Sequence, residues 1–170
     1  SRGLGDVYKR QAQLFKCEQV LRSDCNRGVS GIDGSTSTAA GAACVGEEMT
    51  VLITGDMSFS YDVNGLSSTY LSPRFKIIVM CNGGGGIFRF IKPTSDLPEL
   101  ETCFEIHRDI SVEKYADLFG LRYFELNDEK SAAEVLSLFF AEKDRPAILA
   151  VHTPNVYNAE VLRGYFRRSR

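Results

Sequence analysis

The chain has 170 residues, 44% of them hydrophobic and 25% charged, with a formal net charge of −2. This length fits one domain, which buries about 70% of its unfolded surface and needs no disulfide or metal to fold. The slightly acidic balance argues against a nucleic-acid or anionic-membrane partner, and no apolar run reaches the length of a membrane span.

The cysteines indicate a reducing compartment. Their number is odd, and no two have the spacing of a CxxC motif. This favours a cytoplasmic protein with reduced, mostly buried thiols. A zinc site is not expected, because only His107 and His152 could join the sulfurs and neither stands at ligand spacing. The five cysteines are Cys17, Cys25, Cys44, Cys81 and Cys103.

Residues 1–11 differ in character from the rest of the chain. Their sequence, SRGLGDVYKRQ, has little apolar periodicity and joins abruptly to the segment that follows. We interpret it as a non-native or disordered leader and assign the remainder, residues 12–170, to one domain. The chain is expected to be part of a longer protein.

Helices and strands alternate after this leader. Short apolar runs rich in β-branched residues predict strands, and amphipathic runs predict helices. In chain order we expect helices at 12–21 and 39–45, a strand at 50–54, a helix at 58–70, a strand at 76–81, a loop at 92–102, a helix at 112–119, a strand at 121–126, a helix at 128–142, a strand at 146–152 and a helix at 158–168. Strands separated by helices predict right-handed βαβ units, and therefore a three-layer α/β fold whose mostly parallel sheet is flanked by helices.

Two oxygen-bearing side chains follow neighbouring predicted strands. Asp56 comes after the first strand, Asn82 comes after the second, and glycines fill positions 83–86. Because parallel strands end at the same edge of a sheet, these groups are expected to meet there. A carboxylate, an amide oxygen and the main-chain carbonyl of Gly84 would suit Mg²⁺, and Mn²⁺ accepts the same oxygen set. This pattern predicts a metal ion that holds a diphosphate.

Further residues of the same region support an anion site, although each also has a plainer interpretation. The glycines allow the backbone to approach an anion, and Ser58 is expected to open a helix whose free N–H groups attract phosphate. Taken singly, Gly55-Asp56 is commonly a turn, Asn82-Gly83 a hairpin signal, and a run of glycines a slack loop.

Gly55-Asp56 and Asn82 together resemble the metal-binding motif of the thiamine diphosphate-dependent enzymes. Cys81 stands where that motif usually has a first asparagine, and Met57 where it usually has a glycine. The resemblance implies thiamine diphosphate and Mg²⁺ or Mn²⁺ as cofactors. The implied metal ligands are Asp56, Asn82 and Gly84, and the implied cofactor contacts are Ile32, Gly55, Asp56, Met57, Ser58, Asn82, Gly84, Gly85 and Ile87.

Three longer blocks narrow the resemblance. The sequences NRGVSGIDG at 26–34, GDMSFSYDVNGL at 55–66 and NGGGGIFRFI at 82–91 are similar to the 2-succinyl-5-enolpyruvyl-6-hydroxy-3-cyclohexene-1-carboxylate synthases of menaquinone biosynthesis. The similarity runs from about residue 12 to the end and covers only the C-terminal third of those enzymes. It implies a transferase that decarboxylates 2-oxoglutarate and adds the succinyl-semialdehyde unit to isochorismate.

The same resemblance assigns roles to the remaining site residues. Ile32 would lie under the cofactor and force its rings into a V, and Arg27 would bind a substrate carboxylate. Phe88 and Ile91, with Ile87, would wall the reaction space and exclude water. Each has an alternative that stays open: Arg27 as a surface ion pair, and Ile32 or Phe88 as core residues.

No catalytic residue is assigned within the 170 residues. In enzymes of this kind an activating Glu comes from an N-terminal domain of the neighbouring subunit, which implies a homodimer or tetramer and an inactive isolated chain. No nucleic-acid or membrane partner is expected. Two alternatives remain: another thiamine diphosphate-dependent decarboxylase similar to acetolactate synthase, or a non-catalytic anion-binding α/β module.

Overall fold

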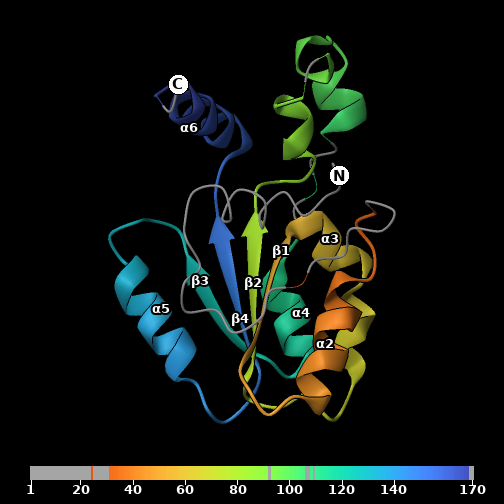
Figure 1. The fold of residues 1–170 in the computed structure, drawn as a ribbon, viewed down its shortest axis with the longest axis vertical. Helices are drawn as coiled ribbons and strands as arrows, with labels where there is room; N and C mark the ends of the chain where they lie inside the picture. Colours follow the sequence, from red (N-terminus) through yellow and green to blue (C-terminus); the bar gives the residue numbers. More distant parts are fainter. Residues whose placement is uncertain (1–23, 25–30, 92, 106–107, 109, 169–170) are drawn as a thin grey trace.

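A four-stranded, all-parallel sheet forms the centre of the computed structural model, which describes residues 24, 31–91, 93–105, 108 and 110–168 (Figure 1). The strand order is β1-β2-β4-β3, and each neighbouring pair is parallel. The strands are β1 (Thr50–Gly55), β2 (Phe75–Cys81), β3 (Arg122–Leu126) and β4 (Ala147–His152). The predicted parallel α/β fold is therefore confirmed, with every strand within one residue of its expected bounds.

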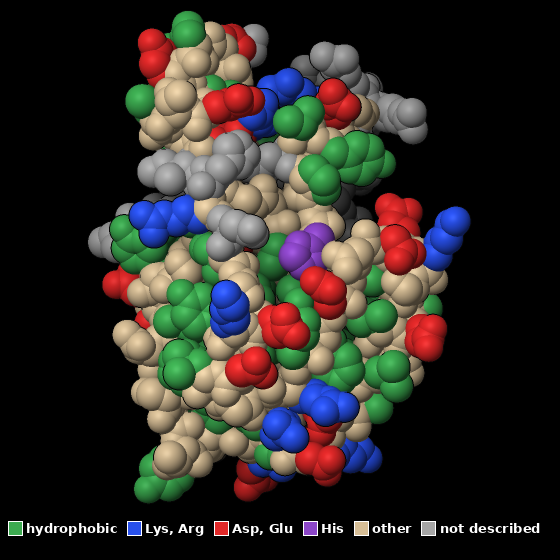
Figure 2. Space-filling model, turned by 180° about the vertical axis from the view of Figure 1, so that it is seen from behind, with side chains coloured by type: hydrophobic (Ala, Val, Ile, Leu, Met, Phe, Trp, Pro, Cys, Tyr) green, Lys and Arg blue, Asp and Glu red, His purple; other side chains and the backbone are tan. Residues whose placement is uncertain are grey.

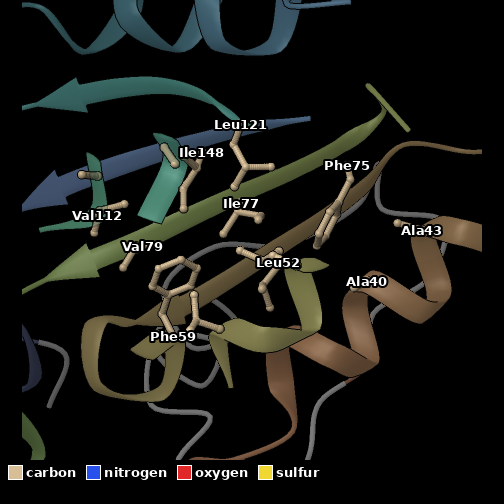
Figure 3. Packing of buried hydrophobic residues seen from close by; sticks show 14 residues of the cluster. Ala40, Ala43, Leu52, Phe59, Phe75, Ile77, Val79, Val112, Leu121 and Ile148 are labelled. Atoms are coloured by element: carbon tan, nitrogen blue, oxygen red, sulfur yellow. The ribbon is translucent and has the colours of Figure 1, made fainter. Parts of the chain in front are cut away.

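Helices cover both faces of this sheet (Figure 1). On one face α2 (Ser35–Val45), α3 (Asp56–Tyr61) and α4 (Val112–Phe119) enclose the larger apolar core, and α5 (Ala132–Ala141) covers a smaller one on the other face. Because β2 and β4 lie inside the sheet and are buried on both faces, their sequences FKIIVMC and AILAVH are almost continuously apolar. Figure 3 shows Leu52, Phe59, Ile77, Val79 and Ile148 meeting in the larger core.

The predicted helix over 58–70 is wrong. The structure has α3 up to Tyr61 and then a separate 3-10 segment, η1 (Val63–Ser67). The break falls at Asp62, whose carboxylate accepts hydrogen bonds from the backbone N–H (2.7 Å) and the hydroxyl (2.8 Å) of Ser37 in the first turn of α2. Asp62 thus satisfies an otherwise unpaired N–H group of a different helix, and a continuous helix would withdraw it.

Other helix bounds also shift. Helix α2 begins at Ser35, four residues earlier than expected. Helix α5 begins late, because the Asp128 carboxylate holds the preceding turn by accepting from the N–H groups of Lys130 (2.8 Å) and Ser131 (3.1 Å). The helix predicted over 12–21 lies outside the described residues.

Beyond the carboxyl ends of the strands, two further parts rise above the sheet (Figure 1). One is the segment after β2, which contains the 3-10 segments η2 (Gly86–Arg89) and η3 (Thr94–Asp96) and the π-helical turn η4 (Leu100–Phe104). The loop predicted over 92–102 thus contains η3 and the beginning of η4. The other is the terminal helix α6 (Asn155–Arg168), which contacts η2. Asp56 and Asn82 lie at the sheet edge from which the segment after β2 leaves.

Two observations concern the surface. No helix in the described part of the chain combines the length and the apolar character needed to cross a membrane. On the face shown in Figure 2, the described acidic and basic side chains are interspersed with apolar ones rather than gathered into a patch of one sign.

Lys76 is buried near the amino end of β2, with 1% of its surface exposed. Its Nζ donates to the carbonyl oxygen of Glu142 at 2.7 Å, past the end of α5, and lies 5.9 Å from the centre of the Phe139 ring. Burial lowers the pKa of Lys76 below its ordinary value of 10.5, and the Glu142 carboxylate offsets part of this effect.

This lowered pKa gives a testable dependence of stability on pH. Between the folded-state pKa of Lys76 and 10.5, the unfolded chain binds more protons than the folded chain, so this residue makes the free energy of unfolding rise with pH. We expect Lys76→Met to lack that rise and to differ from the native chain by only about 1 kcal/mol near neutral pH. Urea unfolding across this range, with native and variant compared at each pH, measures the difference. Equal slopes for the two proteins would contradict the prediction.

Candidate functional site

The site begins where β1 and β2 end side by side. Gly55 pairs in register with Met80, so the next residues of the two strands, Asp56 and Cys81, are neighbours across the sheet edge. Asp56 is the first residue of α3 and Asn82 follows β2 directly. Only 4% of the Asp56 surface is exposed, which is unusual for a carboxylate that merely closes a turn.

Backbone N–H groups surround the Asp56 carboxylate. Its Oδ2 accepts from the N–H groups of Asn82 (3.0 Å), Gly83 (2.8 Å) and Gly84 (3.2 Å). Its Oδ1 accepts from the N–H of Met57 at 2.7 Å. Since a carboxylate oxygen has two lone pairs, Oδ2 is saturated by its three donors, whereas Oδ1 keeps one lone pair for a further partner.

The amide oxygen of Asn82 lies in the same place. Asn82 Oδ1 accepts from the N–H of Gly84 at 3.0 Å, the same N–H group that Asp56 Oδ2 accepts from. Gly83, Gly84 and Gly85 all have positive φ angles, of 86°, 89° and 61°. This left-handed run, which side chains other than glycine rarely adopt, turns successive N–H groups towards one point. The structure thus brings Asp56, Asn82 and the glycine loop together.

This donor set fits a hard divalent cation. The groups with remaining lone pairs are a carboxylate oxygen and an amide oxygen, and the ions that prefer such ligands are Mg²⁺, Mn²⁺ and Ca²⁺. Within the described residues, no three His, Cys, Asp or Glu side chains gather as a metal cluster. A metal at this edge would therefore depend on the amide oxygen, main-chain carbonyls and water in addition to Asp56.

Ile32 is tied to the same edge through Ser58. The Ser58 hydroxyl donates to the Ile32 carbonyl at 2.6 Å, and Ile32 itself is half-buried. The expectation that Ser58 opens its helix is wrong, since α3 already begins at Asp56. The side chain of Ser58 instead connects the segment before α2 to α3.

The predicted apolar wall follows the glycine loop directly. Ile87 and Phe88 lie in η2 and are half-buried, whereas Ile91 is 47% exposed. The centre of the Phe88 ring lies 5.4 Å from that of Phe104, so one side of the Phe88 ring packs against the protein itself. Arg27, the predicted carboxylate contact, lies outside the described residues.

Sequence reasoning missed an ion pair beside this wall. Glu105 is completely buried, and both of its carboxylate oxygens accept from Arg89, with Nε to Oε1 at 2.7 Å. Glu101 binds the same guanidinium at 2.8 Å. Glu105 and then Glu101 raise the pKa of Arg89 above its ordinary value, so it stays charged. The only signal was an arginine within FRF after the glycines and the three glutamates in ELETCFE, with nothing in the sequence to join them.

The cysteines follow the prediction only in part. Cys44, Cys81 and Cys103 are free thiols, but Cys44 and Cys103 are exposed rather than buried. Cys17 and Cys25 lie outside the described residues. Burial, with a smaller contribution from the Asp56 carboxylate, raises the pKa of Cys81 to about 12.

We therefore expect a clear order of thiol reactivity. Because only the thiolate reacts, iodoacetamide should modify Cys44 and Cys103 near pH 8 while alkylating Cys81 on the order of a hundredfold more slowly. Unfolding the protein in urea should remove the difference. Peptide mapping by mass spectrometry at successive times measures each rate. Rapid modification of Cys81 in the folded chain would contradict the raised pKa of this thiol.

Comparison with known proteins places these residues in context. The family described as thiamine pyrophosphate enzyme, C-terminal TPP binding domain, matches residues 3–151. A 2-succinyl-5-enolpyruvyl-6-hydroxy-3-cyclohexene-1-carboxylate synthase from Porphyromonas gingivalis is 49% identical over 158 residues, which are 92% of this chain and 27% of that protein. Proteins of the same name are 43% identical in Flavobacterium johnsoniae (93% of this chain, 28% of that protein) and 41% in Christiangramia forsetii (92% and 27%). The chain thus spans about a quarter of the length of these curated relatives.

Proposed function

Because the chain belongs to the thiamine pyrophosphate enzymes and contains their C-terminal TPP-binding domain, we propose that Asp56, Asn82 and the Gly84 carbonyl hold the Mg²⁺ or Mn²⁺ ion that binds the diphosphate of thiamine pyrophosphate (thiamine diphosphate). The observation that carries this proposal is the Asp56 carboxylate. Its Oδ2 is fixed by three loop N–H groups, one of which also binds the Asn82 amide oxygen, and its Oδ1 keeps a lone pair.

The other site residues surround this metal position. The N–H groups of Gly83 and Gly84 are already bound to Asp56, so Gly85 supplies the loop N–H that faces the diphosphate. Gly55 and Met57 line its approach, since they flank Asp56. Ile32, held by Ser58, supports the cofactor from the side of α3. Thiamine diphosphate, when bound, supplies the chemistry by which a 2-oxo acid loses CO₂ and its remaining acyl unit is transferred.

The apolar wall and Arg27 complete the proposed reaction space. Ile87, Phe88 and Ile91 exclude water from the reacting atoms. Arg27 binds a substrate carboxylate through its guanidinium fork. Support for the wall comes from its position directly after the glycine loop.

For the whole protein we propose the reaction that the sequence resemblance implies: decarboxylation of 2-oxoglutarate and addition of the succinyl-semialdehyde unit to isochorismate, in menaquinone biosynthesis. The shared name of its relatives supports this proposal. The active form is a cytoplasmic homodimer or tetramer in which a second domain supplies the activating Glu, without a nucleic-acid or membrane partner. Free surface thiols such as Cys44 and Cys103 agree with a reducing compartment.

Calorimetric titration tests the cofactor site. We expect the chain to bind thiamine diphosphate in the presence of Mg²⁺, and the binding to vanish when a chelator is added. ADP serves as a control because it carries a diphosphate without thiamine. Equal affinity for ADP without any need for Mg²⁺ would favour the anion-binding module instead.

A chimera tests the reaction. In it, this chain replaces the matching part of the Porphyromonas gingivalis synthase, which supplies the remaining domains. We expect CO₂ release from 2-oxoglutarate with isochorismate as acceptor, and no turnover by the 170-residue chain alone. Preference for pyruvate over 2-oxoglutarate would favour the acetolactate-synthase alternative.

A further inference from the structure

The buried ion pair behind the glycine loop has no role in the site as described so far. Glu105 has no exposed surface, and only 17% of the Arg89 side chain is exposed. The guanidinium binds Glu105 through two nitrogens, and it also contacts the more exposed Glu101. This fork geometry fixes the direction of the Arg89 side chain and therefore of η2, which Arg89 ends.

The backbone of Glu105 packs against the loop as well. A Cβ atom built on Gly85 would lie 2.5 Å from the carbonyl oxygen of Phe104 and 2.7 Å from the Cα of Glu105. On the other side of the loop, the Gly83 carbonyl accepts from the N–H of Arg108 at 3.3 Å. The described residues around Glu105 thus contact the loop at Gly83 and at Gly85.

A third contact reaches Arg89 from α6. The Arg163 Nη2 donates to the Arg89 carbonyl oxygen at 2.5 Å. Arg89 is therefore held by its side chain to the η4 segment and by its main chain to the terminal helix. Two other segments, η4 with Glu105 and the helix α6, therefore converge on Arg89.

Stability alone is a weak reason for such a pair. A buried ion pair costs about as much in desolvation as it returns, and well-packed apolar residues of similar size often replace it without loss. The geometry and the charge of the pair say more about its role than its contribution to stability does. Glu105 is a buried negative charge next to a loop that, in the proposed function, has to accept an anionic diphosphate, and Arg89 neutralises that charge.

We propose that Arg89 and Glu105 are positioning residues for the diphosphate site: together they hold the glycine loop in its anion-accepting shape, and Arg89 cancels the Glu105 charge beside it. This inference rests on the proposed function. Neither residue touches the metal or the cofactor directly. Both act through the backbone of residues 83–89.

Two measurements test the proposal independently. In calorimetric titration with Mg²⁺ and thiamine diphosphate, we expect Arg89→Met to lower the affinity at least about tenfold, because it leaves the Glu105 charge unpaired. The double variant R89M/E105Q should recover part of this loss, since the unpaired charge is gone. Arg89→Lys, which keeps the charge without the fork, should fall between the native chain and Arg89→Met. In the absence of cofactor, amide hydrogen exchange of residues 83–91 should speed up in Arg89→Met.

Lys76→Met is the matched control, because it also removes a buried cation but at the opposite end of β2. It should leave both the affinity and the exchange of residues 83–91 unchanged. If Arg89→Met does not fold, Arg89→Lys and the double variant carry the comparison. Native affinity in all of the folded Arg89 variants, or an equal loss in Lys76→Met, would overturn the proposal. If the native chain binds no cofactor but residues 83–91 still exchange faster in Arg89→Met, the proposed function is overturned, and the pair is shown only to hold the loop.

Discussion

Asp56→Asn is expected to abolish Mg²⁺-dependent binding of thiamine diphosphate and to lower the free energy of unfolding by about 2–4 kcal/mol. The change keeps the size of the side chain but removes its charge and one acceptor oxygen. Calorimetric titration and urea unfolding measure the two effects separately. The expected loss of affinity is on the order of a hundredfold or more, as for the removal of a metal ligand.

The large expected loss of stability in Asp56→Asn follows from the four N–H groups that donate to the carboxylate. An asparagine has one acceptor oxygen and one donor NH₂ group. With its oxygen towards the loop, the NH₂ group meets the N–H of Met57 and the proposed metal. With its oxygen towards Met57, the NH₂ group meets the loop N–H groups of Asn82, Gly83 and Gly84. Each orientation leaves buried donors without an acceptor, which costs more than the loss of an ordinary hydrogen bond.

Asp128→Asn is the matched control. Asp128 also accepts from backbone N–H groups, and its hydrogen bonds, those of Ser131 first, lower its pKa. It is exposed and precedes α5, far along the chain from the glycine loop. We expect this substitution to change stability slightly and cofactor affinity not at all. If Asp56→Asn bound the cofactor as the native chain does, the metal site would have to lie elsewhere.

The sheet could be predicted from the sequence because its signal is local. The β2 sequence FKIIVMC is apolar apart from Lys76, as expected for a strand buried on both faces, and the strand ends one residue before the glycines begin. The predicted helix bounds were wrong where a polar side chain forms hydrogen bonds with a residue far away in the sequence. Asp62 reads as an ordinary helix residue until its partner Ser37, 25 positions earlier, is known. Amphipathic pattern alone carries no information about that pairing.

Some residues of the candidate site could likewise be predicted from the sequence, and others could not. Asp56 and Asn82 could be found because strand ends in a parallel sheet share one edge, so their position along the chain implies their position in space. Arg89 and Glu105 could not, because the segment between them lacks the periodicity of a helix or a strand. Their pairing depends on the close approach of Gly85 to the backbone of Glu105, which only the folded chain reveals.

Among Gly41, Gly85 and Gly120, the substitution Gly85→Ala should destabilise the chain most. Gly85 has φ at +61°, where an alanine costs about 1–2 kcal/mol. The new Cβ would also lie 2.5 Å from the Phe104 carbonyl oxygen and 2.7 Å from the Glu105 Cα, and both of these are backbone atoms. Since backbone cannot rotate away as a side chain does, overpacking adds about 1–3 kcal/mol. We expect unfolding at lower urea concentration and a weakened affinity for thiamine diphosphate.

Substitutions at two other glycines distinguish the effect of backbone strain from the effect of steric overlap. Gly120 ends α4 with φ at +67° but has open space around its Cβ position, so Gly120→Ala should show the backbone strain alone, about 1–2 kcal/mol, with native cofactor affinity. Gly41 lies exposed inside α2, also with open space, and Gly41→Ala should stabilise the chain by about 0.5–1 kcal/mol, because alanine is the better helix former. Urea unfolding of the three variants should therefore rank Gly85→Ala below Gly120→Ala and Gly41→Ala above the native chain. If Gly85→Ala matched Gly120→Ala in stability and in cofactor affinity, the contact between the loop and Glu105 would not constrain the site, and the positioning role of that segment would fail with it.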